Sequence, residues 1–442
     1  MTNVAHRSLK DVYRKAVRGD GIYVYDTEGN KYLDGSSGAG VSCLGHSNAR
    51  VIDAIREQAS KLCFASSVFY TNDPSEELAA VLAKDAPGDL RFATFGCGGS
   101  EQVEGALKIA RQYHVDRGEP SRSIMIARRQ SYHGMTLGTL NVGGHAGRRQ
   151  LYNPMFAPTH LIAPHYAYRE RHADETPEAY SLRVANELET KILELGQENV
   201  AAFIAEPVVG ATNGCVAADE DYFKRIREIC DQYHVLLILD EVFCGMGRTG
   251  TRHACEQDGV VPDLLVMAKG LGGGYQPISA LLISERVIDV IKGGRGYIAN
   301  GHTYMNHPLN CAAGLAVQQE ISDRDLIANV RKQGAYLQSR LEDSFSQHPH
   351  VGDIRGRGLM QALEFVSDRE TKSPFPAEKQ LWAKLQKTAM THGLMCYPNG
   401  GTIDGLNGDH VILAPPYIIE ENQIDEMVEK LEKSVAQTIN QL

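Results

Sequence analysis

The chain has 442 residues, of which 43% are hydrophobic and 23% charged, and its formal net charge is −10. An acidic chain lacks the clustered lysine and arginine that bind nucleic acids and membrane surfaces, and no apolar run approaches the roughly eighteen residues that a membrane helix needs. The composition therefore favours a small-molecule partner, and a chain of this length can bury a pocket for one.

The cysteines and histidines do not indicate a metal or a disulfide framework. The 9 cysteines are scattered and never spaced as CxxC, and the 16 histidines form no HExxH motif. We therefore expect reduced thiols and no bound metal.

The N-terminal stretch predicts a location and one structural element. Residues 1–20 are polar and lack the apolar core of a secretory signal, so we expect a cytoplasmic protein. The next stretch, GIYVYDTEGNKYLDG at residues 21–35, has two β-prone runs around Thr-Glu-Gly-Asn and predicts a hairpin.

Short apolar runs then alternate with helical patterns. The runs are FATFG (92–96), SIMIAR (123–128), VAAFIAEPVV (200–209), VLLILDEV (235–242), LLVMAK (264–269) and ISALLIS (278–284). Each is too short and too apolar for an amphipathic helix, so we interpret them as strands buried on both faces. With helices predicted at 100–116 and 219–235, the pattern predicts an α/β fold with a mainly parallel sheet. The polar stretch 169–198 is predicted to be an exposed helix or loop.

The pattern changes from residue 314 onward. A long helical region is followed by two strand-like pieces, GLMQALEFV (358–366) and HVILAPPYI (410–418), and by a terminal helix. This favours a second, smaller α+β domain, with which the N-terminal hairpin can pack. The predicted divisions are an N-terminal segment of the small domain (1–60), a large domain (61–315) and the remainder of the small domain (316–442).

Several predicted strands end in residues that suit one kind of chemistry. In open α/β sheets, ligands bind at the carboxyl ends of the strands. One run delivers Asp240, another delivers Lys269, and FATFG leads into CGGSEQ (97–102), a glycine-rich turn at a helix start that suits a phosphate. Each signal alone also has a structural explanation, because Asp240 or Ser100 can cap a helix and a lysine before glycines can lie in a surface turn.

Taken together, these residues indicate a pyridoxal 5′-phosphate (PLP) site. PLP requires an amine for the imine, an acid that keeps the pyridine nitrogen protonated, and a phosphate anchor. Tyr132 and His133, which follow the run at 123–128, can supply an aromatic platform for the ring. Without the other parts, they would be interpreted as ordinary loop residues.

The chain resembles the class III aminotransferases, the ω-amino acid:pyruvate type of the fold-type-I PLP enzymes, over essentially its whole length. The motifs that carry the resemblance are YLDGSSGAGVSCLGH (32–46), GGSEQVEGALKIAR (98–111), SYHGMTLG (131–138), AFIAEPVVG (202–210), LILDEVFCGMGRTG (237–250), VMAKGLGGGYQPISA (266–280), GHTYMNHPLNCAAGLA (301–316) and RGRGLMQALEF (355–365). Their order, with Lys269 lying 29 residues after Asp240, makes the set specific.

The resemblance implies a fold and a cofactor site. The fold is a large domain with a mainly parallel sheet of the seven-stranded type between helices, plus a smaller α+β domain built from both termini. Lys269 is implied as the lysine that forms the imine with PLP, and Asp240 as the partner of the pyridine nitrogen. The other implied cofactor contacts are Gly99 and Ser100 at the phosphate, Tyr132 and His133 beside the ring, Val242 behind it, Glu206 near the ring hydroxyl, and Thr303, which reaches the phosphate from a neighbouring subunit. A homodimer, alone or as half of a dimer of dimers, is therefore implied.

The implied reaction moves an amino group from an amine or ω-amino acid to a keto acid, with pyruvate as the favoured acceptor. It proceeds by ping-pong chemistry through pyridoxamine phosphate. Two alternatives stay open. One is a racemase or decarboxylase of the same fold, and the other is a non-catalytic cofactor-binding protein, which is disfavoured because both Lys269 and Asp240 are present.

Two positions depart from the family pattern. Gly98 stands where a serine is usual in the phosphate turn. ω-Aminotransferases of this class often carry an arginine shortly before the Pro-Pro segment that grips a substrate carboxylate, but this region holds no arginine and contains Leu406, Asn407 and His410. The candidate substitutes are Arg148, Arg149, Arg355 and Arg357. The expected substrate pocket comprises Ser37, Ala39, Gly40, Phe69 and Tyr70.

Overall fold

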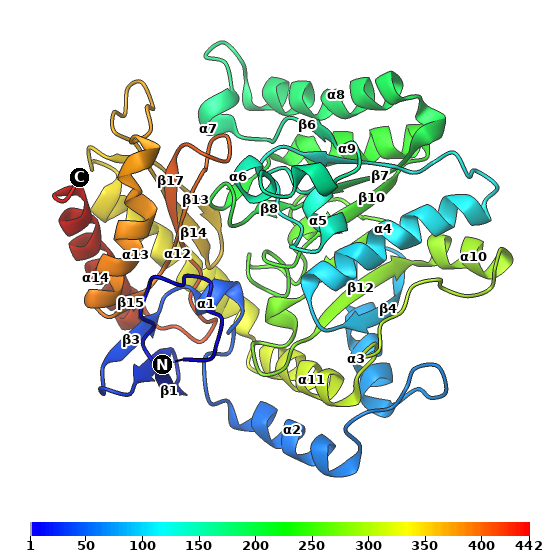
Figure 1. Cartoon of the computed structure of the whole chain (residues 1–442), viewed down its shortest axis with the longest axis horizontal. Coiled ribbons are helices and arrows are strands. Elements are labelled where there is room, and N and C mark those ends of the chain that lie inside the picture. The colour runs from blue at the N-terminus through cyan, green and yellow to red at the C-terminus, as the bar shows by residue number, and fades with distance from the viewer. Residues whose placement is uncertain (1) are drawn as a thin grey trace.

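A sheet of seven strands forms the centre of the larger part of the molecule (Figure 1). The computed structural model describes residues 2–442. In spatial order the strands are β4 (Leu90–Gly96), β12 (Ser279–Ser284), β11 (Leu264–Met267), β10 (Leu236–Asp240), β7 (Val200–Ala205), β5 (Ile124–Arg128) and β6 (His160–Ile162). Only β12 runs antiparallel to its neighbours, so the predicted α/β fold with a mainly parallel sheet is confirmed.

Helices cover both faces of this sheet, which is why its strands are so apolar. Helices α4 (Gly99–Asp116) and α10 (Glu285–Gly293) share a buried cluster with one face. The other face packs in a second cluster with α3 (Asp73–Lys84), α8 (Pro177–Leu195), α9 (Glu220–Tyr233) and α11 (Pro308–Asp323). Strand β10 is buried at every position, as expected for a strand covered on both sides.

Two predictions about this region need correction, and one strand was missed. The run at 200–209 is not one strand, because pairing with β10 ends at Ala205 and Val208–Val209 forms a separate strand, β8, that pairs with β9 (Val216–Ala217). The stretch 169–198 is not simply exposed, because α8 buries an apolar face against α9. Strand β6 was missed because it has only three residues.

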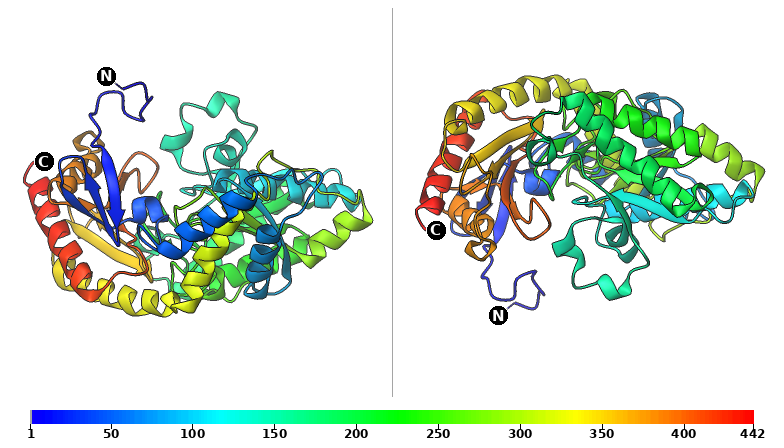
Figure 2. Two further views of the ribbon diagram at one scale, coloured as in Figure 1. Left: turned by 90° about the horizontal axis from the view of Figure 1, so that it is seen from below. Right: turned by 90° about the horizontal axis from the view of Figure 1, so that it is seen from above.

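Segments from both ends of the chain form the smaller part of the molecule. Strands β1 (Ala16–Asp20), β2 (Tyr23–Asp26), β3 (Lys31–Asp34) and β15 (Leu394–Met395) form one sheet, which contains the predicted hairpin β2–β3. A second sheet contains β13 (Val351–Arg357), β14 (Met360–Phe365), β17 (Asp409–Leu413) and β16 (Tyr397–Gly400). Helices α12 (Leu326–Phe345), α13 (Leu381–Thr391) and α14 (Glu421–Ile439) share its buried cluster. Figure 2 shows both chain ends on this side.

The remaining α-helices are α1 (Ser37–Gly40), α2 (Ala49–Lys61), α5 (Leu137–Val142), α6 (Ala146–Arg149) and α7 (Ala167–Glu170). Because α11 continues through residues 315 and 316, no break in the chain marks the predicted domain boundary there, and the division stays a prediction. None of the helices formed by residues 2–442 combines the length and the apolar character needed to span a bilayer.

Arg248 joins the two parts of the molecule. Its side chain is completely buried, and its guanidinium donates hydrogen bonds to the carbonyl oxygens of Leu359, at 3.0 Å, and Pro415. It also lies 4.6 Å from the ring centroid of Tyr417 and donates to Ser37 Oγ at 3.4 Å. The Arg248 guanidinium therefore satisfies polar groups of three segments, each more than a hundred residues from it in the sequence.

We expect Arg248→Leu to lower the free energy of unfolding by about 3 kcal/mol, because it leaves buried carbonyl groups without donors. Urea denaturation followed by circular dichroism measures the change. Arg56→Leu, which removes an exposed arginine paired with Asp53, serves as the control and should cost less than about 1 kcal/mol. Equal stability of the two variants would contradict this role for Arg248.

Candidate functional site

A cavity of about 730 Å³ lies at the carboxyl ends of the central strands. Strands β10 and β11 are parallel, with Asp240 opposite Val266, so Asp240 and Lys269 leave the sheet at the same edge. Strand β4 has the same direction as β11 because β12 lies antiparallel between them. The predicted residues that line the cavity are Ala39, Gly99, Ser100, Tyr132, His133, Arg148, Glu206, Asp240, Val242 and Lys269.

The Asp240 carboxylate is held from two sides. Its Oδ2 lies 2.8 Å from His133 Nδ1, and its Oδ1 accepts a hydrogen bond from the Val242 amide at 3.0 Å. Asp240 and His133 are 4% and 2% exposed, so water does not compete for these bonds. The other ring nitrogen of His133, Nε2, is buried and has no hydrogen-bond partner among the described residues. The Asp240 carboxylate is therefore fixed in orientation, while Nε2 of the neighbouring His133 stays available for a hydrogen bond.

Lys269 follows β11 with an unusual backbone conformation. Its φ is +43°, in the left-handed region that non-glycine residues rarely adopt, and such strain is typical of functional positions. Its Nζ lies 4.3 Å from the ring centroid of Phe243. Burial lowers the pKa of Lys269 to about 8, against the opposing charges of Asp240 and Glu206. A substantial fraction of this amine is neutral, and thus nucleophilic, close to physiological pH.

The start of α4 forms an anion cradle on the same cavity. The first amides of a helix have no partner within the helix, and Gly99 and Ser100 contribute this end of α4 to the cavity wall. A Cβ atom at Gly99 would lie 3.0 Å from the Val242 side chain, so glycine keeps the turn open. Ser100 Oγ accepts a hydrogen bond from the Met135 amide at 3.1 Å.

Glu206 supports the segment that carries Tyr132. Its carboxylate accepts hydrogen bonds from the amides of Tyr132, at 3.2 Å, and Gly210, at 3.4 Å. Burial raises the pKa of Glu206 above its ordinary value. The Tyr132 ring is half-buried in the cavity wall, with the Arg148 guanidinium 4.6 Å from its centroid. Glu206 thus holds the Tyr132 backbone, and Arg148 lies against its ring.

Other predicted residues do not reach this cavity. Ser37 is completely buried and turned toward Arg248, so the structure brings Ala39 to the cavity but not Ser37. Gly40 also lies outside the lining and packs against the Phe243 ring. Phe69 and Tyr70 are 77% and 68% exposed on the surface.

Thr303 is exposed and lies outside the cavity lining. Its predicted role depends on a neighbouring subunit and stays a prediction.

Several lining residues were missed by the sequence analysis. Phe243 lies only three residues after Asp240, so its place beside Lys269 could have been predicted from the same motif. Arg7 and Tyr397 line the cavity from the two ends of the chain, and no local pattern connects them to it.

These residues fit the requirements of PLP. The cavity brings together an amine of lowered pKa, an oriented carboxylate, an aromatic ring and a helix start suited to phosphate. Within residues 2–442, no group of three or more His, Cys, Asp or Glu residues is arranged to hold a metal ion.

Comparisons with known proteins identify the family. Residues 4–435 match the family model described as Aminotransferase class-III. An uncharacterised aminotransferase of Schizosaccharomyces pombe is 46% identical over 424 residues, which are 96% of this chain and 92% of the relative. The putrescine–pyruvate aminotransferase of Pseudomonas aeruginosa is 35% identical over 431 residues, which are 96% of this chain and 91% of the relative.

A solved structure agrees with the family model and the sequence relatives. The (S)-enantioselective ω-transaminase from Thermomicrobium roseum matches with a TM-score of 0.91 and 34% identity, over 97% of this chain and 93% of that chain. The seven-stranded sheet is that of the fold-type-I PLP enzymes. The chain therefore belongs to the class III aminotransferases.

Proposed function

We propose that this aminotransferase uses PLP to move an amino group from an amine or ω-amino acid to a keto acid, with pyruvate as the acceptor. The observation that carries the proposal is the pairing of Lys269 and Asp240 at adjacent strand ends in one cavity. The relative from Pseudomonas aeruginosa that is named for putrescine and pyruvate supports this choice of substrates.

Each residue of the site has a part in this function. When bound, PLP supplies an aldehyde that takes up the amino group and a pyridinium ring that withdraws electrons from the donor carbon. Before a donor binds, Lys269 would hold the cofactor aldehyde through Nζ, and once released its amine, whose pKa is lowered to about 8, can accept a proton and return it. Asp240, oriented by His133, would hold the proton of the ring nitrogen. Gly99 and Ser100 would bind the phosphate, and Tyr132, Val242 and Glu206, which line the same cavity, would surround the ring.

The same proposal includes a homodimer in which Thr303 reaches the site of the partner copy. Exposed aromatic side chains gather near Thr303, because the rings of Phe64 and Tyr304 lie 5.9 Å apart and are 41% and 56% exposed. A surface of this kind favours burial against another chain. The cytoplasmic location and the dimer of dimers stay predictions from the sequence.

Lys269→Ala should lower the transamination rate at least about 10³-fold, because the variant loses both the covalent anchor and the proton carrier. Its visible absorbance should be that of unattached PLP. Lys292→Ala, which removes an exposed lysine 3.9 Å from Asp289, is the control and should keep the wild-type rate and spectrum. Normal turnover by a folded Lys269→Ala variant would refute the proposed function.

Attachment of PLP to the cofactor-free protein should depend on pH. Because the pKa of Lys269 is lowered to about 8, the neutral amine and the attachment rate should rise about tenfold from pH 7 to pH 9. The charge of Asp240 raises this pKa, so Asp240→Asn should shift the rise to lower pH. Stopped-flow absorbance measures the attachment rates of the wild type and of Asp240→Asn. A wild-type attachment rate that rises only above pH 10 would contradict a buried lysine.

A further inference from the structure

The cavity contains a cation that the proposed chemistry does not use. Arg148 lies on α6 and lines the cavity with its side chain half-buried. No aspartate or glutamate in the described part of the chain forms an ion pair with it. Its contact there is the Tyr132 ring, 4.6 Å from the guanidinium. A half-buried arginine without a carboxylate has its donors available for an anion from solution.

Two of the other arginines that the sequence suggested are already occupied, whereas Arg7, which also lines the cavity, is exposed. Arg355 pairs with Asp353 at 2.7 Å and with Glu364 at 2.6 Å, and Arg357 pairs with Asp258 at 3.0 Å. Their guanidinium groups therefore cannot receive a substrate without breaking these ion pairs.

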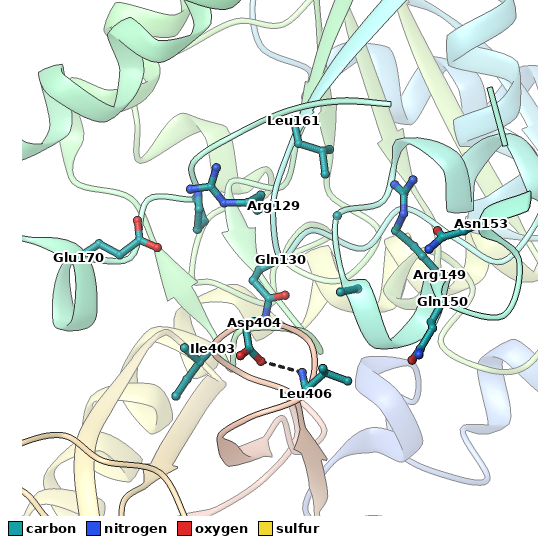
Figure 3. A pocket seen from close by; sticks show the side chains of 13 residues that line it. Arg129, Gln130, Arg149, Gln150, Asn153, Leu161, Glu170, Ile403, Asp404 and Leu406 are labelled. Carbon is teal, nitrogen blue, oxygen red and sulfur yellow. Dashed lines mark hydrogen bonds between the residues drawn. The ribbon is translucent and has the colours of Figure 1, made fainter. Parts of the chain in front are cut away.

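Arg149, next to Arg148, serves another purpose. It donates hydrogen bonds to the carbonyl oxygens of Asn141, at 2.6 Å, and Gly143, and to Thr159 Oγ1 at 2.7 Å. It lines a separate cavity of about 550 Å³, where Figure 3 shows it across from Arg129 and Glu170. Adjacent arginines of α6 thus serve different cavities.

The loop at residues 401–408 fixes the backbone that carries Arg148. Gly405 has φ +89°, and a Cβ atom there would lie 2.7 Å from the Ala146 nitrogen, so loop and helix are in close contact. Gln130 Nε2 donates to the carbonyl oxygens of Gly401, at 2.7 Å, and Thr402, at 3.0 Å. This is the region in which related ω-aminotransferases are expected to carry an arginine, and here it supports α6 instead.

The acidic residue of this loop does not neutralise Arg148. Asp404 accepts hydrogen bonds from the amides of Leu406, at 2.8 Å, and Asn407, at 2.7 Å, and from Asn407 Nδ2 at 2.7 Å. Figure 3 shows the bond between Asp404 and Leu406 within the loop, beside the separate cavity. The carboxylate is thus bound within its own turn.

We propose that Arg148 binds the carboxylate of the substrate, so that the acceptor site selects keto acids over uncharged aldehydes. This rests on the proposed transamination. The positively charged Arg148 lines the same cavity as Lys269 and Asp240. Its charge is opposite in sign to that of a keto acid. A guanidinium binds a carboxylate through paired, charge-assisted hydrogen bonds that an aldehyde cannot form.

The test compares pyruvate with propanal, which has the same number of carbon atoms and no carboxylate. Arg148→Leu should raise KM for pyruvate about 10- to 100-fold and change kcat/KM for propanal less than about 3-fold. Arg129→Leu removes the same charge from the separate cavity and should match the wild type with both substrates. Thermal melting and the spectrum of bound PLP confirm that each variant is folded and loaded.

A binding measurement separates this proposal from the proposed function. Calorimetric titration of the loaded enzyme with propanoate needs no turnover, and Arg148→Leu should lose the binding that Arg129→Leu keeps. Equal binding by both variants, or a pyruvate KM that responds to Arg7→Leu and not to Arg148→Leu, would overturn the assignment. If the wild type binds propanoate through Arg148 but transfers no amino group, the proposed function alone is wrong.

Discussion

The common direction of β4, β10 and β11 is the constraint on which the site depends. Because these strands end at one edge of the sheet, Asp240, Lys269 and the start of α4 meet in a single cavity. The sheet can hold them there only if both of its faces are buried, since the strands are too apolar to face water. The packing that determines the fold thus also fixes the spacing of the reactive groups.

The same burial sets the chemistry of these groups. It lowers the pKa of Lys269 to about 8 and raises that of Glu206 above its ordinary value. Burial also keeps water from the bond between His133 and Asp240. A site that water could enter freely would leave Lys269 as an ordinary protonated lysine. The burial of these groups therefore determines their chemistry.

The two ends of the chain complete the cavity from the smaller part of the molecule. Arg7 and Tyr397 line it, and the 401–408 loop supports α6 beneath Arg148. Arg248 bonds the two parts together through carbonyl groups of Leu359 and Pro415. The proposed selection of substrates by Arg148 thus depends on contacts between segments that are far apart in sequence.

The sequence predicts best what local patterns encode. Asp240 and Lys269 could be identified because each ends a buried run, and most of the central strands because both faces are apolar. Strand β1 could not, because it is short, polar and largely exposed. The burial of Ser37 depends on Arg248, 211 residues away, and no local pattern encodes that contact. The buried face of α8 did leave a signal, since Tyr180, Val184, Leu188 and Ile192 recur at helical spacing.

The most direct test of the proposed transamination is a single half-reaction. The PLP-loaded enzyme is mixed with an amine or ω-amino acid donor in the absence of any acceptor, and the carbonyl product and the cofactor spectrum are followed. We expect one equivalent of carbonyl product per site with full conversion of the cofactor to its aminated form, and pyruvate should then restore the spectrum and yield one equivalent of alanine. A donor that is racemised or decarboxylated while the cofactor spectrum stays unchanged would contradict the proposed transamination.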